Sequence, residues 1–104
     1  MSKLKHKKKF HENGELWREE WWLNGELHNE EGPATVNYRR DGSVIGKWWW
    51  LNGKLHNEEG PAYIGYKRDG SVWVKEWYLD GVQHTEEEWH EIVFRKVFEE
   101  QILR

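Results

Sequence analysis

One polar motif, repeated along the chain, carries the side chains that could do chemistry. It reads His-Asn-Glu-Glu at residues 28–31 and 56–59, and His-Thr-Glu-Glu at residues 84–87. Histidine and carboxylate side chains bind zinc, and they act as acids and bases in hydrolases. Taken alone, the motif therefore suggests a metal site or an acid–base site in each copy.

The spacing of the copies argues against both kinds of site. Equivalent residues are 28 positions apart, which in a chain of hairpins places them two strands apart, at about 9.6 Å. His28, His56 and His84 therefore cannot share one zinc ion, whose ligands lie at about 2.0–2.2 Å. Glu30 and Glu58 would also lie beyond the limit of about 9.5 Å for a pair of glycosidase carboxylates. We expect no catalytic residue, no metal and no cofactor, and we expect that the chain is not an enzyme.

A structural role accounts for most of the motif. Asn29 and Asn57 are expected to close loops as Asx turns. Thr85 and Glu88 form a capping box, which predicts a helix over about residues 86–103. His28 and His56 are expected opposite tryptophans across two-residue turns, where they stack on the rings. As an alternative, they could help aromatic side chains to hold a planar anion such as a nucleotide.

These residues are positioned by a 28-residue repeat. Leu-His-Asn-Glu-Glu-Gly-Pro-Ala stands at 27–34 and at 55–62, and Asp-Gly-Ser-Val stands at 41–44 and at 69–72. Asn-Gly and Asp-Gly pairs between aromatic and β-branched runs are typical of β-hairpins. We therefore expect a mainly β fold, an antiparallel meander of about six strands built from three imperfect repeats and followed by one C-terminal α-helix.

The expected domain is single, with the β repeats in residues 1–84 and the helix in residues 85–104. Prolines at 33 and 61 cannot donate to a ladder, so the strands predicted at 26–39 and 54–67 should be interrupted by protruding loops. The other strands are expected near residues 4–10, 15–23, 43–51, 71–79 and 82–84.

Composition narrows the class of protein. Of the 104 residues, 37% are hydrophobic, nine are tryptophan and none is cysteine, so aromatic rings must supply the core and a disulfide framework is excluded. A net charge of -3 gives no general attraction to nucleic acid, which basic domains bind. No apolar run reaches the roughly 18 residues of a membrane helix, and the start lacks the apolar stretch of a signal peptide. We expect a cytoplasmic protein.

The tryptophans should lie on both faces of the sheet. Residues two apart share a face, so one face should carry Trp17 with Trp21, then Trp49, then Trp73 with Trp77. One helix of about 27 Å could cover only part of one face of such a sheet. We therefore expect the remaining aromatic face to bind a partner or a second copy of the chain.

The first ten residues form the only basic block, with lysines at 3, 5, 7, 8 and 9. In the repeat register, this block is an edge strand. Lysines on a sheet edge discourage other strands from adding to it. Binding of phosphate or of an acidic partner is the alternative.

The hairpins resemble a variant of the MORN-type repeats found in small proteins of phages, giant viruses and bacteria. The resemblance covers residues 10–84 and rests on Trp-Trp-Leu-Asn-Gly-Lys-Leu-His, on Glu-Gly-Pro-Ala and on the Tyr-x-x-Asp-Gly turn. It departs from the usual unit in its 28-residue length, its extra tryptophans and its Glu-Glu-Gly-Pro-Ala insert. The resemblance implies a binding scaffold and, for a phage protein, an inhibitor of a host defence protein, acting in the host cytoplasm.

The sequence as a whole predicts a non-enzymatic binding protein. Its aromatic sheet face is expected to contact a protein partner, a second copy of the chain, or both, without nucleic acid or membrane. The alternative is an oligomeric sponge that sequesters a nucleotide signal. The expected binding residues are Trp17, Trp21, Trp49, Trp73, Trp77, His28 and His56.

Overall fold

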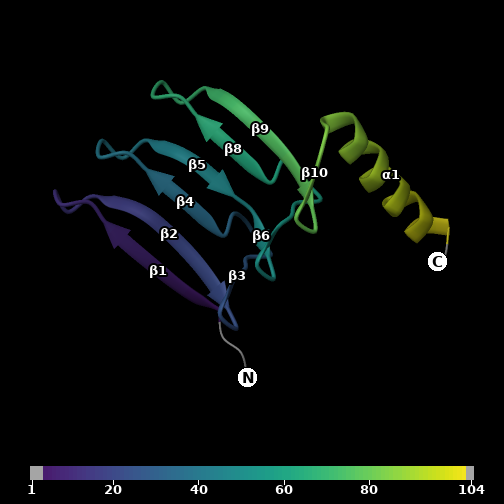
Figure 1. The fold of residues 1–104 in the computed structure, drawn as a ribbon, viewed down its shortest axis with the longest axis horizontal. Helices are drawn as coiled ribbons and strands as arrows, with labels where there is room; N and C mark the ends of the chain where they lie inside the picture. The colour runs from purple at the N-terminus through teal and green to yellow at the C-terminus, as the bar shows by residue number, and fades with distance from the viewer. Residues whose placement is uncertain (1–3, 103–104) are drawn as a thin grey trace.

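A computed structural model describes residues 4–102 of the chain as an antiparallel sheet followed by one helix (Figure 1). The strands of the sheet follow the order β1-β2-β4-β5-β8-β9-β10, β3 pairs with β2, and β6 pairs with β7 as a separate ribbon. This confirms the predicted mainly β meander and its C-terminal helix. The elements are β1 (Lys5–Phe10), β2 (Leu16–Leu23), β3 (Glu26–Leu27), β4 (Thr35–Tyr38), β5 (Val44–Trp48), β6 (Trp50–Leu51), β7 (Lys54–Leu55), β8 (Tyr63–Tyr66), β9 (Val72–Leu79), β10 (Val82–His84) and α1 (Glu86–Ile102).

The strand predicted at 26–39 is divided into β3 and β4, and that at 54–67 into β7 and β8. The loops that divide them hold the Asn-Glu-Glu-Gly-Pro segments, as expected from the prolines, so the main sheet has eight strands instead of about six. Trp50 pairs with Leu55 across a two-residue turn. In that turn, Asn52 and Gly53 have φ angles of 50° and 75°, the left-handed pair that matches the twist of the flanking strands.

Three β-bulges recur at one place in the 28-residue register. Pairing shifts by one residue in β1–β2, β4–β5 and β8–β9, which leaves Trp17, Ile45 and Trp73 unpaired. At Trp73, the indole nitrogen lies 2.7 Å from the position that a Cβ on Gly65 would take, and so does a methyl carbon of Val74. Trp73 therefore lies on the face of Val74. Trp77 lies three residues after Val74, so strand alternation places it on the other face. The prediction that Trp73 shares a face with Trp77 is wrong, and Trp17 occupies the same bulge position in β2.

The molecule is thin and has little buried interior. Its extents are 54 × 39 × 20 Å, and its radius of gyration is 15.7 Å, compared with about 13 Å for a compact domain of this length. Its accessible surface is 7476 Å², compared with about 6200 Å² for a compact monomer of this mass. The buried hydrophobic side chains of residues 4–102 are Ala34, Val36, Ala62 and Trp89. Most of the other aromatic side chains are only half-buried.

The helix covers only the end of one face of the sheet, where Trp89 packs against Trp77. Figure 1, viewed down the shortest axis, shows α1 beside β10 and extending away from the strands. Its start is fixed by the predicted capping box: Glu88 N–H donates to Thr85 Oγ1 at 3.1 Å, and Thr85 N–H donates to Glu88 Oε1 at 2.9 Å. Because the helix begins directly after β10, it continues past the end of the sheet.

The predicted last residue of the helix, Leu103, and the first lysine of the basic block, Lys3, lie outside the described residues. Within residues 4–102, no helix combines the length and the apolar composition needed to cross a bilayer.

Candidate functional site

A row of alternating tryptophans and alanines crosses one face of the sheet. The N–H of Trp21 donates to the Ala34 carbonyl, and the N–H of Trp49 donates to the Ala62 carbonyl, each at 2.8 Å. The strand register places these residues and Trp77 on the same face. Both alanines are fully buried, so a small side chain separates each pair of large rings. We call these five residues the Trp–Ala row.

Both ends of the Trp–Ala row are covered by other rings. The imidazole of His6 stacks on Trp21 with a centroid distance of 4.2 Å and an interplanar angle of 9°. At the other end, Trp89 of α1 lies 4.8 Å from Trp77. Among the aromatic contacts of the described residues, none involves Trp49. The central ring of the row is therefore the one without a ring partner.

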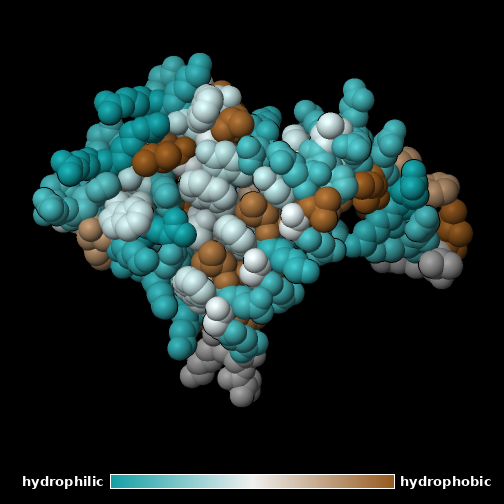
Figure 2. Space-filling view, in the orientation of Figure 1, coloured by the Kyte–Doolittle hydropathy of each residue, from teal (hydrophilic) through white to brown (hydrophobic). Residues whose placement is uncertain are grey.

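Trp49 and Leu51 contribute to the wall of a cavity of about 260 Å³ between two copies of the His-Asn-Glu-Glu loop. Figure 2 shows side chains of intermediate and high hydropathy gathered over the middle of the sheet, with hydrophilic side chains around them. The cavity is strongly acidic, because each loop contributes two carboxylates. The polar residues that line it are Asn29, Glu30, Glu31, His56, Asn57, Glu58 and Glu59.

His28 and His56 each bind the turn of the next repeat. The N–H of Asn52 donates to Nδ1 of His28 at 3.0 Å, and the N–H of Asp80 donates to Nδ1 of His56 at 2.9 Å. Because Nδ1 accepts, each ring is the neutral tautomer that carries its proton on Nε2. Nε2 of His28 faces Glu30 at 3.4 Å, and Nε2 of His56 faces Glu58 at 3.3 Å.

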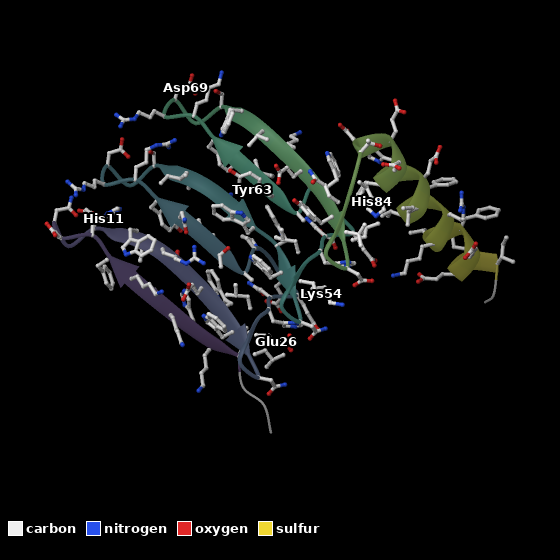
Figure 3. The ribbon with its side chains drawn as sticks, in the orientation of Figure 1. His11, Glu26, Lys54, Tyr63, Asp69 and His84 are labelled. Carbon is white, nitrogen blue, oxygen red and sulfur yellow. The ribbon has the colours of Figure 1, made fainter. Side chains whose placement is uncertain are left out.

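Backbone hydrogen bonds flank each histidine contact in the same pattern. Gly53 N–H donates to the Leu27 carbonyl at 3.0 Å, and Gly81 N–H donates to the Leu55 carbonyl at 2.8 Å. The Glu26 side chain also packs against the backbone of the next turn, since its carboxylate oxygen lies 2.7 Å from the position that a Cβ on Gly53 would take. Figure 3 shows Glu26 and Lys54 at the same end of the sheet, where these turns are stacked. The histidines thus join repeat to repeat.

These contacts decide the predictions for the motif. His28 and His56 lie opposite Trp21 and Trp49, as predicted, because their N–H groups donate to those carbonyls at 2.9 and 3.0 Å. The prediction that they stack on the rings is wrong, since the imidazoles instead turn toward the next repeat. The Asx turns are confirmed: Oδ1 of Asn29 accepts from Glu31 N–H, and Oδ1 of Asn57 accepts from Glu59 N–H, both at 3.0 Å.

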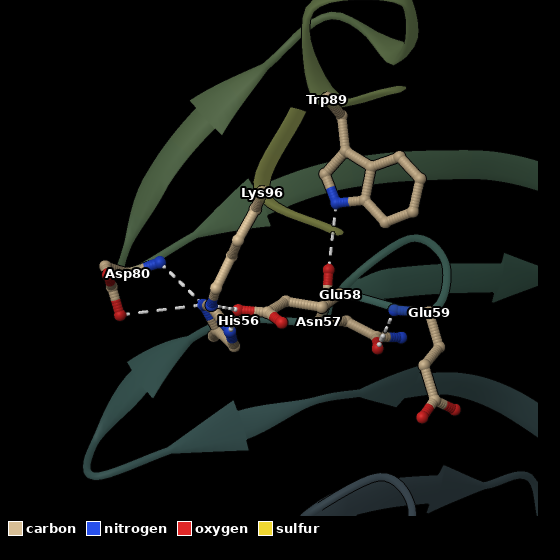
Figure 4. Close-up of polar contacts among 7 residues, drawn as sticks. All are labelled: His56, Asn57, Glu58, Glu59, Asp80, Trp89 and Lys96. Atoms are coloured by element: carbon tan, nitrogen blue, oxygen red, sulfur yellow. Dashed lines mark hydrogen bonds and ion pairs between the residues drawn. The ribbon is translucent and has the colours of Figure 1, made fainter. Parts of the chain in front are cut away.

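The second loop also holds the helix (Figure 4). The indole N–H of Trp89 donates to the Asn57 carbonyl at 2.8 Å, and the Lys96 ammonium lies 2.6 Å from the Glu58 carboxylate. The hydrogen bond between Lys96 and Glu58 holds the pKa of Glu58 below its ordinary value and raises the pKa of Lys96. One wall of the acidic cavity is therefore fixed by α1.

The opposite face of β2 carries a charged network that the sequence did not reveal. Glu20, which is 5% exposed, accepts from Arg18 Nε at 2.6 Å and from the Trp22 indole at 3.2 Å. Burial alone would raise the pKa of Glu20, but these hydrogen bonds outweigh burial and lower it. Glu19 lies on the face of the Trp–Ala row and accepts a hydrogen bond from Tyr38. Burial and this hydrogen bond raise the pKa of Tyr38 to about 12. The consecutive charged residues Arg18, Glu19 and Glu20 within an otherwise apolar strand were the available signal.

Two glycines within strands have a packing role that sequence reasoning missed, because only the Asn-Gly and Asp-Gly pairs were interpreted. Gly46 and Gly65 pair with each other across β5 and β8. A Cβ on Gly46 would lie 2.9 Å from the Trp48 ring and 3.1 Å from the Tyr63 ring. These rings stack on each other at 4.8 Å, so the glycines make room for an aromatic pair.

The described residues hold no group of three or more histidine, aspartate or glutamate side chains placed to bind a metal ion. No family model, curated protein or solved structure matches the chain. The resemblance to MORN-type repeats therefore stays a prediction.

Proposed function

We propose that the chain is a non-enzymatic binding protein whose Trp–Ala row contacts a protein partner through Trp49. The observation that carries this proposal is the cavity of about 260 Å³ that combines the half-buried Trp49 with four carboxylates, of which Glu58 is paired with Lys96. A cation over an indole face, with carboxylates around it, is held by cation–π attraction and by charge. The partner group that fits is the side chain of a lysine or an arginine.

Selection from a random peptide display library on the immobilised protein tests this proposal. We expect enrichment of peptides with a basic residue beside apolar residues, and loss of that enrichment in Trp49→Ala. Phe10→Ala is the control, because Phe10 is 58% exposed and lies on β1, at the far edge of the sheet. Retention of the enriched peptides by a folded Trp49→Ala variant would contradict the proposal.

Self-association is the second part of the proposal. The accessible surface is larger than that of a compact monomer of this mass by at least about 1000 Å². The outer side of α1 contributes a stripe formed by Phe94, Phe98 and Ile102, which are 73%, 53% and 64% exposed. Light scattering should give a mass above that of one chain, and Phe98→Glu should reduce it. A monomeric mass at micromolar concentration would contradict the proposed self-association.

Because the repeats resemble those of small phage proteins, the partners to test first are bacterial defence proteins. Sequestration of a nucleotide is the alternative function, and the geometry supports it less. Nδ1 of His28 and of His56 already accepts a backbone hydrogen bond, and the adjoining carboxylates repel phosphate. A higher melting temperature in the presence of cyclic or linear nucleotides would favour this alternative, because a ligand that binds the native state raises the apparent stability of the protein.

A further inference from the structure

The last repeat has a vacant strand position. β2 pairs with β4 through residues 18–20, and β5 pairs with β8 through residues 46–48. The corresponding residues of β9 are Val74, Lys75 and Glu76, but the segment 28 residues after β8 is part of α1. β10 pairs only with Trp77, Tyr78 and Leu79. Within residues 4–102, no strand lies against the outer edge of β9 from residue 72 to residue 76.

Backbone groups on this edge lack the partners that their equivalents have. The N–H groups of Trp21 and Trp49 donate to alanine carbonyls, whereas the position equivalent to those alanines beside Trp77 is His90 of α1, and Trp77 pairs with His84 of β10 instead. Beyond that pair the edge is open: by strand alternation, Lys75 directs its N–H and C=O outward, because Glu76 accepts from Ala62 on the inner side. An open row of donors and acceptors is a template for an added strand.

A groove runs along this edge. A cavity of about 520 Å³ has β9 on one side, through Lys75, Glu76 and Trp77, and the start of α1 on the other, through Thr85, Glu86 and Glu88. Three of its lining residues are glutamates and one is a lysine, so its charge favours a basic occupant. Val72 and Trp73, at 44% and 64% exposed, supply apolar surface at the upper end of the edge.

We propose that the outer edge of β9 accepts an extended basic peptide segment of a partner protein as an additional antiparallel strand. The existing repeats set its register. Residues of the added segment that correspond to Thr35, Val36 and Asn37 of β4 would lie opposite Glu76, Lys75 and Val74. Lysine or arginine opposite Glu76 meets the carboxylates of the groove, whereas a basic residue opposite Lys75 is disfavoured. This site is separate from the Trp49 cavity and does not depend on it.

The probe is a synthetic peptide with the sequence of residues 33–39 that carries Thr35→Lys and Asn37→Lys. The same peptide with glutamate at both positions tests charge, and a version with N-methylated alternate amides tests the ladder without changing charge. We expect fluorescence anisotropy to show binding of the lysine peptide, at least tenfold weaker binding of both controls, and slowed hydrogen exchange of the Lys75 amide. Equal binding of the N-methylated peptide, or no slowing at this amide, would overturn the proposal.

Two protein variants extend the test. Glu86→Lys reverses one charge of the groove and should weaken binding of the lysine peptide several-fold, whereas Glu12→Lys, an exposed residue distant in the sheet, should not. In Trp49→Ala, the lysine peptide should still slow hydrogen exchange of the Lys75 amide, because that amide reports on the edge of β9 alone. Loss of this slowing in a folded Trp49→Ala variant would assign the peptide to the Trp49 cavity and overturn the edge site, while leaving the proposed function in place.

Discussion

The imidazole of His56 accepts a 2.9 Å hydrogen bond from the backbone N–H of Asp80, which lies 24 residues later in the next turn. His28 accepts the corresponding bond from Asn52. The acceptor is a side chain and the donor is a turn amide with a left-handed residue, at a φ angle of 49° for Asp80 and 50° for Asn52. The motif that first suggested catalysis therefore connects neighbouring repeats.

Replacement of this histidine should loosen the repeat boundary. His56→Ala removes the acceptor of the Asp80 amide from a ring that is only 11% exposed, and we expect a loss of about 1–3 kcal/mol in the free energy of unfolding. Urea denaturation measures it. His84→Ala is the matched control, because no turn of the described chain follows His84 to donate to its ring. If His84→Ala lowered the free energy of unfolding as much as His56→Ala, the proposed connection between repeats would be contradicted.

Acid should release the helix. The folded pKa of Glu58 is below its ordinary value, so the stabilisation from Glu58 and Lys96 is complete above the ordinary pKa of glutamate, about 4.3. It is lost as the pH falls from there through the lowered pKa. The NMR signal of the Trp89 indole N–H, which donates to Asn57, reports on the docking of α1. In Glu58→Gln, this part of the acid transition should disappear, whereas in Glu59→Gln it should stay.

Glu20 should be intolerant of neutralisation. Glu20→Gln leaves the Arg18 guanidinium without its charged partner at a nearly buried position, and we expect a loss of about 1.5–3 kcal/mol. Thermal unfolding at neutral pH measures the effect. Glu12→Gln, at an exposed position, should change stability by no more than about 0.5 kcal/mol. Similar losses in the two variants would show that the network around Glu20 does not stabilise the sheet.

A methyl group on Gly65 should strain the sheet. The added Cβ would lie 2.7 Å from atoms of Tyr63, Trp73 and Val74, so Gly65→Ala should cost about 1–3 kcal/mol. Gly60→Ala is the control, since its nearest neighbour is 3.8 Å away. In the double variant Gly65→Ala/Trp73→Ala, part of the loss should be recovered because the ring that crowds the methyl group is gone. Full additivity of the two losses would rule out this contact.

The sequence was sufficient for the order of the elements, because the turns are encoded locally. Asn52-Gly53 closes a two-residue hairpin whatever surrounds it, and Thr85 with Glu88 starts a helix from four adjacent residues. The interruption of the long strands followed from proline chemistry for the same reason. Local patterns of this kind need no knowledge of the packing.

What the sequence did not predict depends on contacts between repeats. The bulge at Trp73 moves its ring to the face of Gly65, and no local pattern marks the shift in register. The Nδ1 contact of His56 depends on how one turn stacks on the next. The direction of α1 depends on where β10 ends, and no local pattern indicates how far the helix extends past the sheet. A signal for the histidine contact was present, since histidine recurs 28 residues apart beside an asparagine.

The recurrence of the histidine contact has a consequence for how the molecule opens. Each contact joins one repeat to its immediate neighbour, so coupling in this chain is one-dimensional. The middle repeat, joined on both sides through His28 and His56, should be the last to exchange its amide hydrogens, while the end bearing β1 opens and recloses without it. The protein is therefore expected to unravel from its termini inward, with a gradient of protection in place of a single cooperative unit.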